Sequence, residues 1–175
     1  VFKEGDLGSS MFTVCENGGT FKVTVDGTDV GELMEGDMFG ETALLLKRPR
    51  SSTVTCASPT CRILEMRGDD FLQLISNSPE WVEKSFRDLS RRREFKKALL
   101  LTGKDASINL KDLFNRIDTD NDGRLSLAEV KTVLLKFDPE FPETELVALV
   151  ESMDLDGNGY ITWKEFKRVV GQGIR

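Results

Sequence analysis

Two twelve-residue segments of this chain carry oxygen-bearing side chains at matching positions, thirty-six residues apart. They are residues 118–129 (DTDNDGRLSLAE) and 154–165 (DLDGNGYITWKE). Such a loop surrounds a hard cation with oxygens: acidic or amide side chains alternate, a Gly permits the sharp turn, a backbone carbonyl adds a ligand, and the closing Glu binds with both oxygens. We therefore expect two Ca²⁺ ions, held by Asp118, Asp120, Asp122, Arg124 and Glu129 in the first loop and by Asp154, Asp156, Asn158, Tyr160 and Glu165 in the second.

Apolar residues recur at helical spacing on both sides of each loop, which predicts an amphipathic helix before and after it. Position 8 is also apolar, Leu125 in one loop and Ile161 in the other, and suits a short strand pairing between the loops. A single such segment could be an Asp-rich surface turn, but two with flanks in register favour a cation site. Residues 105–173 resemble the EF-hand family, as an adjacent pair. The flanking residues are Leu110, Leu113, Phe114, Ile117, Val130, Val133, Leu134 and Phe137, then Leu146, Leu149, Val150, Met153, Phe166, Val169 and Val170.

Residues 1–66 alternate short β-favouring runs with Gly- and Asp-rich turns. Expected strands include residues 11–14, 20–25, 30–33 and 52–55. Several short strands at this spacing predict a small antiparallel barrel or sandwich. The predicted fold class is therefore α+β, with an N-terminal antiparallel β-barrel or jelly roll carrying short helices and a C-terminal all-α pair of helix–loop–helix units.

Residues 39–54 (FGETALLLKRPRSSTV) interrupt the strands with a short apolar helix. Backbone N–H groups at a helix start can hold a phosphate, Arg50 can fork onto its oxygens, and Glu41 can accept hydrogen bonds from a ribose hydroxyl. The segment resembles the phosphate-binding cassette of the cyclic nucleotide-binding domain family, whose pattern F-G-E-x-A-L, then P-R, it matches without a gap. The resemblance implies cAMP or cGMP as a ligand, bound by Phe39, Gly40, Glu41, Thr42, Ala43, Arg50, Ser51 and Ser52.

By position in that family, Arg50 would pair with the cyclic phosphate and Glu41 with the ribose 2′-hydroxyl. Ser51 stands where a hydroxyl can favour guanine, which leaves cAMP and cGMP both open. The family's leading helix and first strand would precede Val1, so we expect an N-terminally incomplete barrel. The alternative is a member of this fold that has lost its ligand, and the presence of both Glu41 and Arg50 argues against it.

We expect four parts: residues 1–77 as the cyclic nucleotide-binding barrel, 78–101 as a basic lid or connecting helix, 102–107 as a linker and 108–175 as the EF-hand pair. Residues 69–75 are the expected helix after the barrel. The basic helix has two interpretations. It is a lid packed on the barrel, or it is a calmodulin-type target that the downstream lobe grips within the same chain. The second follows from Val82, Phe86, Leu89 and Phe95, which fall at relative positions 1, 5, 8 and 14.

Composition adds exclusions. The net charge of −6 divides into −1 for residues 1–104 (15 basic, 16 acidic) and −5 for residues 105–175 (9 basic, 14 acidic), so the acidity belongs largely to the cation loops. We expect no nucleic-acid partner, and no apolar run approaches a membrane span. The absence of histidine excludes Ser/His, Cys/His and zinc–histidine chemistry. Cys15, Cys56 and Cys61 lack metal-type spacing, and we expect reduced, mostly buried thiols in a cytoplasmic protein.

These features predict a non-enzymatic regulatory module with two inputs, Ca²⁺ and a cyclic nucleotide, that acts on an unknown effector. Two alternatives place the segment in a longer protein, either a cyclic-nucleotide-dependent protein kinase or the cytosolic tail of a nucleotide-gated channel. A third is an EF-hand protein that does not switch on Ca²⁺ binding. Neither kinase signature motifs nor a membrane span occur in these residues.

Overall fold

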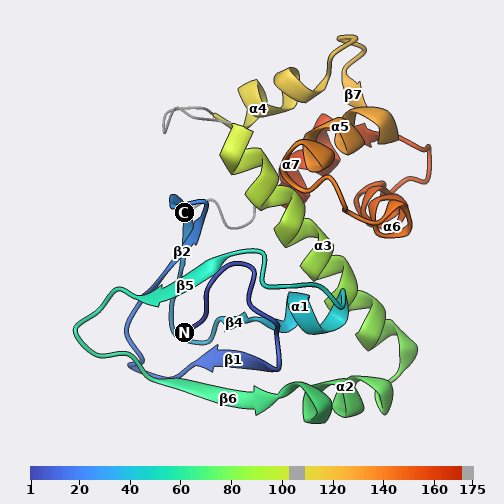
Figure 1. The fold of residues 1–175 in the computed structure, drawn as a ribbon. Helices are drawn as coiled ribbons and strands as arrows, with labels where there is room; N and C mark the ends of the chain where they lie inside the picture. Colours follow the sequence, from blue (N-terminus) through green and yellow to red (C-terminus); the bar gives the residue numbers. More distant parts are fainter. Residues whose placement is uncertain (103–108, 171–175) are drawn as a thin grey trace. The chain divides into compact units, whose positions relative to one another are not determined.

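The computed structural model describes residues 1–102 and 109–170 and divides into two compact units, residues 1–90 and 91–175. The division falls inside α3 (Glu80–Thr102), so the two ends of one helix belong to different units (Figure 1). The expected linker, apart from residue 102, lies outside the described residues. Among those described, none of the helices is both long and apolar enough to cross a bilayer.

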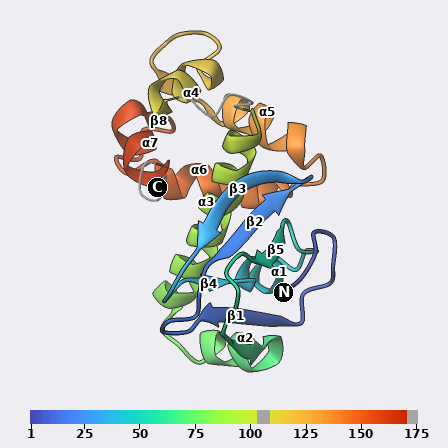
Figure 2. The ribbon, with the colours of Figure 1, turned by 90° about the vertical axis from the view of Figure 1, so that its left-hand side faces the viewer.

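The first unit contains two three-stranded antiparallel sheets, ordered β4-β1-β6 and β3-β2-β5. In the second sheet β2 and β3 lie side by side with a register shift after Val23 (Figure 2). This confirms the expected small antiparallel β domain, built as two facing sheets in the described part of the chain. The strands are β1 (Ser10–Val14), β2 (Phe21–Val25), β3 (Thr28–Leu33), β4 (Met38–Phe39), β5 (Thr53–Cys56) and β6 (Ile63–Arg67).

Aromatic and branched side chains that alternate along these strands form the core between the sheets. Phe21, Phe39 and Val54 are at most 4% exposed, and Phe12 stacks on Phe39 with ring centroids 5.3 Å apart. A second cluster packs α1 (Glu41–Leu45) and α2 (Gly68–Ser76) against Met11 of β1. This cluster therefore holds α1, the helix of the predicted cassette segment, against β1.

The first half of α3 packs on this second cluster. Val82 and Phe86 contact it, and Phe86 meets Phe71 edge to face with ring centroids 5.9 Å apart. Arg87 donates a hydrogen bond of 2.6 Å to the carbonyl of Leu45, the last residue of α1. Residues 80–90 therefore pack on the first unit, and their role as a lid stays a prediction.

The second unit consists of two helix–loop–helix segments joined by a two-stranded sheet of β7 (Arg124–Leu125) and β8 (Ile161–Thr162). The register places Leu125 opposite Ile161, as the apolar residues at position 8 predict. Both side chains are fully buried. The helices are α4 (Leu110–Ile117), α5 (Leu127–Phe137), α6 (Glu143–Met153) and α7 (Trp163–Val170).

The expectation of reduced, mostly buried thiols is wrong for two of the three cysteines. Cys56 and Cys61 form a disulfide with Cα atoms 5.9 Å apart, and Cys15 is free. Cys56 is exposed and Cys61 half-buried. The sequence does not reveal this pairing, because it depends on the turn that brings the end of β5 back toward β6.

Candidate functional site

The first predicted cation loop gathers carboxylates at one point. Oxygen atoms from Asp118, Asp120 and Glu129 all lie within 4.8 Å of one another. The Asp118 carboxylate accepts backbone hydrogen bonds from Asp122 (3.1 Å) and Gly123 (3.0 Å), which fold the loop around it. Three converging anionic oxygens in such a loop suit Ca²⁺, which takes hard oxygen ligands.

Asp122 differs from its predicted role in this structure. Its Oδ1 accepts a hydrogen bond of 2.8 Å from the Arg124 N–H, and its Oδ2 pairs with the Arg124 guanidinium at 3.1 Å. The structure thus brings together the residues at positions 1, 3 and 12 and holds position 5 against Arg124. A half-exposed pair of this kind is weak and releases its carboxylate readily.

The second loop repeats this arrangement. Oxygen atoms of Asp154, Asp156 and Glu165 also lie within 4.8 Å of one another. The amide oxygen of Asn158 accepts a hydrogen bond of 2.9 Å from the N–H of Tyr160. Burial on its own raises the pKa of Asp154, but hydrogen bonds from the backbone of Gly159, Asn158 and Gly157 outweigh it and leave that pKa below its ordinary value. The loop is therefore shaped to hold this side chain as a carboxylate.

The closing glutamate of the first loop is fixed by hydroxyl groups. Glu129 Oε1 accepts from the N–H (2.7 Å) and Oγ1 (3.0 Å) of Thr119, and Oε2 accepts from the N–H (2.9 Å) and Oγ (2.8 Å) of Ser126. Burial tends to raise the pKa of Glu129, but these hydrogen bonds outweigh it and lower the pKa below 4.5. The hydroxyl of Ser126, at position 9 of the loop, thus orients the closing carboxylate.

Glu165 in the second loop is held in the same way, with one difference. Its Oε2 accepts from the N–H (2.8 Å) and Oγ1 (2.6 Å) of Thr162, and its Oε1 from the N–H of Leu155 (2.7 Å). Burial again raises and these hydrogen bonds lower its pKa, with a net decrease below 4.5. Leu155 stands where the first loop has Thr119, so Glu165 lacks the second hydroxyl donor. A search of the sequence for acidic ligands misses Thr119, because its hydroxyl does not bind the cation but donates a hydrogen bond to a ligand, Glu129.

The two loops contact one another through their seventh residues. The guanidinium carbon of Arg124 lies 4.4 Å from the ring centroid of Tyr160, and Arg124 pairs with Thr162 in the β7–β8 ladder. Predicted as backbone ligands, these two residues also join the loops through their side chains. The two loops are therefore in direct contact through these side chains and a shared strand pair.

The second half of α3 belongs to the core of this lobe. Phe95, Ala98 and Leu99 are at most 4% exposed and lie in the same apolar cluster as the helices flanking the loops. Arg91 donates a hydrogen bond of 2.6 Å to Glu145 of α6, and Arg92 bonds the carbonyl of Ser152. This part of α3 is an additional helix packed against the four helices of the pair.

Only part of the proposed target pattern takes part in this packing. Phe95 enters the lobe, Val82 and Phe86 pack in the first unit, and Leu89 is 41% exposed. The 1-5-8-14 spacing is therefore not a single interface. The pattern failed because it treats the helix as having one apolar stripe, whereas α3 has a different buried face in each half.

In the first unit, Gly40 begins the cassette helix with φ of 86°. The positive φ favours glycine, and a Cβ there would lie 2.8 Å from Nη1 of Arg50, so the guanidinium would have to shift. Glu41, the first residue of α1, is 2% exposed and accepts a hydrogen bond of 3.2 Å from the hydroxyl of Thr42. The turn thus places a buried carboxylate beside a buried guanidinium.

Arg50 is the most unusual side chain of this region. It is 5% exposed, donates hydrogen bonds to the carbonyls of Gly40 (2.5 Å) and Ser10 (2.6 Å), and lies 4.2 Å from the ring centroid of Phe2. Its buried Nε has no hydrogen-bond partner. Burial lowers the pKa of Arg50, and the negative charges of Glu41 and Asp6 partly oppose that decrease. A buried donor without an acceptor is costly, by about 1–3 kcal/mol, and an anionic oxygen would satisfy it.

A cavity of about 660 Å³ adjoins the cassette without including Glu41 or Arg50 in its wall. Its lining includes Ala43 and Leu44 of the cassette helix and Gly8 before β1. Ser51 is half-buried and Ser52 buried, just before β5. The predicted nucleotide residues therefore extend from the end of β4 through α1 to the segment before β5, with the Phe2 ring against the Arg50 guanidinium.

Comparison with known families agrees with both regions. Residues 1–78 match the family model described as cyclic nucleotide-binding domain, and residues 108–171 match the one described as EF-hand domain pair. Both resemblances seen in the sequence are thereby confirmed, in the expected order along the chain.

Individual relatives match smaller parts. Calcium-dependent protein kinase 9 of Oryza sativa subsp. japonica is 40% identical over 78 residues, covering 42% of this chain and 14% of that protein. Probable calcium-binding protein CML34 of Arabidopsis thaliana is 39% identical over 68 residues, covering 39% and 52%. The solved regulatory domain of Toxoplasma gondii PKA with cAMP is 31% identical, with a TM-score of 0.41, covering 61% and 39%. The chain spans 14% to 18% of the length of the first four curated relatives.

Proposed function

The chain combines a cyclic nucleotide-binding domain with an EF-hand domain pair, and from this premise we propose that it is a cytoplasmic regulatory module that senses both Ca²⁺ and a cyclic nucleotide. Both families are ligand-binding domains rather than catalytic ones. The two signals act together on an effector.

The calcium half of this proposal rests on the two convergent carboxylate groups. Two ions bind, one in each loop, through side-chain oxygens at positions 1, 3, 5 and 12 and the carbonyl oxygens of Arg124 and Tyr160. Asp122 leaves the Arg124 guanidinium to complete the first site. The preformed hydrogen bonds to Glu129 and Glu165 support this, because they hold both closing carboxylates in place before an ion arrives.

The nucleotide half rests on one observation, the buried Arg50 guanidinium with an unsatisfied Nε beside the buried Glu41. The cyclic phosphate of cAMP or cGMP would supply the missing acceptor, and Glu41 would accept from the ribose 2′-hydroxyl. The backbone of Gly40 and of Ser51 and Ser52 would complete the pocket. Phe2 lies over the face of the guanidinium and leaves its N–H groups, which lie in the guanidinium plane, free of the ring.

Helix α3 is the element through which the two sites communicate. Its first half contacts the cluster behind the cassette and its second half lies in the EF-hand core. Ca²⁺ binding reorients EF-hand helices in sensor proteins, so a change around Phe95 alters the conformation favoured for the rest of α3. The first half of α3 then packs differently beside the nucleotide site.

Calorimetric titration of Ca²⁺, cAMP and cGMP into the full-length protein tests the proposal, each ligand with and without the others. Two Ca²⁺ ions and one nucleotide per chain are the expected stoichiometries. Absence of nucleotide binding at millimolar cAMP and cGMP would identify the first domain as a retained fold without its ligand. One Ca²⁺ or none would overturn the calcium half.

A second candidate is the regulatory segment of a protein kinase, because calcium-dependent protein kinases are among the matching relatives. In that case the effector is a catalytic domain in the same polypeptide. Phosphotransfer by the full-length protein, measured in Ca²⁺ and in chelator, distinguishes this candidate from a separate effector. A third context, the tail of a nucleotide-gated channel, predicts membrane spans in the same gene product.

A further inference from the structure

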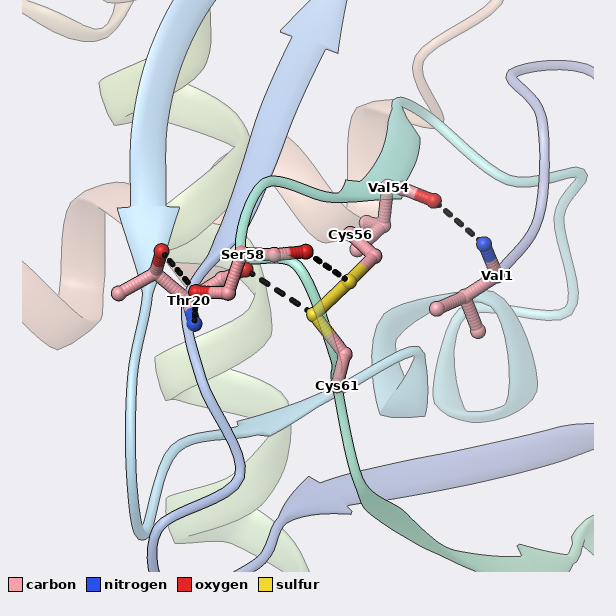
Figure 3. Close-up of a disulfide and its surroundings, with 6 residues drawn as sticks. All are labelled: Val1, Thr20, Val54, Cys56, Ser58 and Cys61. Atoms are coloured by element: carbon pink, nitrogen blue, oxygen red, sulfur yellow. Dashed lines mark hydrogen bonds between the residues drawn. A yellow bond between two sulfur atoms is a disulfide. The ribbon is translucent and has the colours of Figure 1, made fainter.

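The Cys56–Cys61 disulfide closes the connection between β5 and β6 at an accessible position. Cys56 is the last residue of β5, and Cys61 lies two residues before β6 (Figure 3). Cys56 is exposed. Only five positions separate the two cysteines, so the bond constrains the unfolded chain much less than a long crosslink does. A small contribution to stability and an exposed sulfur both favour thiol–disulfide exchange.

The surroundings suit the reduced pair as well as the disulfide. The Sγ of Cys56 lies 3.2 Å from the carbonyl oxygen of Ser58, and the Sγ of Cys61 lies 3.4 Å from that of Thr20. A disulfide sulfur carries no hydrogen, so these oxygens gain a donor only when each sulfur is a thiol. Each reduced thiol therefore finds an acceptor without movement of the loop.

The loop is also held independently of the sulfur bond. Ala57 donates a backbone hydrogen bond of 2.9 Å to the carbonyl of Thr20, and the Thr20 N–H donates one of 2.8 Å to the hydroxyl of Ser58. Arg62 donates one of 3.0 Å to the carbonyl of Gly18. These bonds keep the two thiols facing one another after reduction, which permits the disulfide to form again.

We propose that Cys56 and Cys61 are a reversible dithiol–disulfide redox site of this chain. Its reductant is a small or protein dithiol. One thiolate of the dithiol attacks the exposed sulfur of Cys56 and releases Cys61 as a thiolate, which takes up a proton. The second thiol of the reductant loses its proton and displaces Cys56, so the reductant ends as a disulfide and the chain gains two electrons and two protons.

The redox state of the pair changes how firmly β5 is held. In the β2–β5 ladder, Cys56 lies opposite Phe21 and Val54 lies opposite Val23. The Val54 N–H also donates a hydrogen bond of 3.0 Å to the carbonyl of Phe2. The disulfide anchors the end of this strand to the segment just before β6. Its reduction removes this covalent anchor and leaves only hydrogen bonds to hold that end, so amide exchange at Val54 and along the β2–β5 ladder becomes faster.

The test uses the full chain with Cys15→Ser, which leaves the pair as its only cysteines. The protein is equilibrated over graded ratios of reduced to oxidised glutathione, quenched with acid and alkylated. Mass spectrometry then counts the thiols. The expected result is a reversible change of two thiols within the ratios sampled, and slower amide exchange in β5 of the oxidised form.

Three outcomes would overturn the proposal: a pair that stays oxidised in excess reduced dithiothreitol, a pair that never closes in excess oxidised glutathione, or β5 exchange that ignores the redox state. The double variant Cys15→Ser/Cys56→Ser is the control, because Cys61 alone cannot form an intramolecular disulfide. None of these measurements involves Ca²⁺ or a nucleotide, so they are independent of the proposed function.

Discussion

Phe95 of α3 meets Phe166 of α7 edge to face, with ring centroids 6.4 Å apart and both side chains fully buried. Phe166 in turn contacts Phe114 and Trp163, so the phenyl ring of Phe95 completes an aromatic cluster inside the EF-hand pair. A residue N-terminal to both cation loops is thus part of the core that supports them. The stability of the lobe should depend on it.

Phe95→Ala should lower the free energy of unfolding of the second unit by about 3–5 kcal/mol, because it removes a buried ring from a packed core. Denaturation followed by the fluorescence emission of Trp163 measures this change. The measurement uses a Trp81→Phe background, which removes the emission of Trp81, a side chain that is 69% exposed. The matched control is Leu89→Ala on the same helix, which should change stability by no more than about 0.5 kcal/mol. Equal effects of the two variants would show that the second half of α3 does not stabilise the lobe.

Glu129→Gln and Glu165→Gln should each remove one Ca²⁺ site, because the closing ligand loses its charge and one strong donor oxygen. The remaining ions should bind with dissociation constants of about 10⁻⁷–10⁻⁵ M, the range of sensor EF-hands. Calorimetry measures the stoichiometry. Glu151→Gln, on α6 outside both loops, serves as the control and should leave two ions bound. A variant of either closing residue that still binds two ions would contradict these ligand assignments.

In chelator, the second unit should become less stable as the pH falls. The pKa values of Glu129, Glu165 and Asp154 are lower in the folded state than their ordinary values of 4.5, 4.5 and 3.8. A group whose pKa is lower in the folded state stabilises the fold at pH values above its ordinary pKa. This contribution is lost as the pH falls through the folded-state pKa. Urea denaturation between neutral pH and pH below 3.8 measures the effect. The double variant Glu129→Gln/Glu165→Gln should show a smaller dependence, and stability that rises on acidification would refute the prediction.

Arg50→Ala should weaken nucleotide binding by about 2–4 kcal/mol, because the phosphate loses a buried bidentate partner. Arg50→Lys should recover only part of that loss, since an ammonium cannot reproduce the fork. Arg62→Ala is the control, because Arg62 also donates to backbone carbonyls, those of Glu16 and Asn17, but lies outside the cassette. Unfolding measurements on each variant separate lost binding from lost folding. Unchanged affinity in folded Arg50→Ala would remove Arg50 from the site.

Local patterns predicted the two helix–loop–helix segments because each loop is contiguous, and the ligand assignments within the loops stay predictions. Leu125 and Ile161 pair as their positions indicate. The carboxylates of Asp118 and Glu129 lie close together because the two residues are the ends of one twelve-residue loop. The cassette is similarly local, from Gly40 to Arg50. Contacts that depend on the rest of the fold could not be predicted. They include the Arg50 bond to the Ser10 carbonyl and the stacking of Phe2 on that guanidinium.

The basic helix shows the same limit. The sequence spacing of Phe86 and Phe95 suggests a common face, yet one ring packs beside Phe71 and the other beside Phe166. Apolar periodicity indicates that a helix is amphipathic but does not identify its partner. The disulfide was missed for a related reason, because three cysteines permit several pairings and only the β5–β6 turn selects one.

The last prediction concerns coupling between the two ligands. If α3 transmits the signal, Ca²⁺ changes nucleotide affinity, and nucleotide changes Ca²⁺ affinity by the same factor, because a coupling free energy is reciprocal. Helix α3 is packed at both ends, so a rearrangement around Phe95 disturbs the contacts of Phe86 and Arg87 with the cassette side. We therefore expect negative coupling, on the order of 1–3 kcal/mol.

Glu145→Gln tests this route without touching a Ca²⁺ ligand, because it weakens the partly buried pair with Arg91 that anchors α3 to α6. The coupling energy should decrease while two Ca²⁺ ions still bind. Glu143→Gln is the matched control, since Glu143 pairs with Lys131 at a more exposed position away from α3. Calorimetric titration of nucleotide in saturating Ca²⁺ and in chelator gives the coupling energy for each protein. Identical nucleotide affinities in the two conditions would mean that the domains are independent sensors, and that the packing of α3 in the lobe serves stability alone.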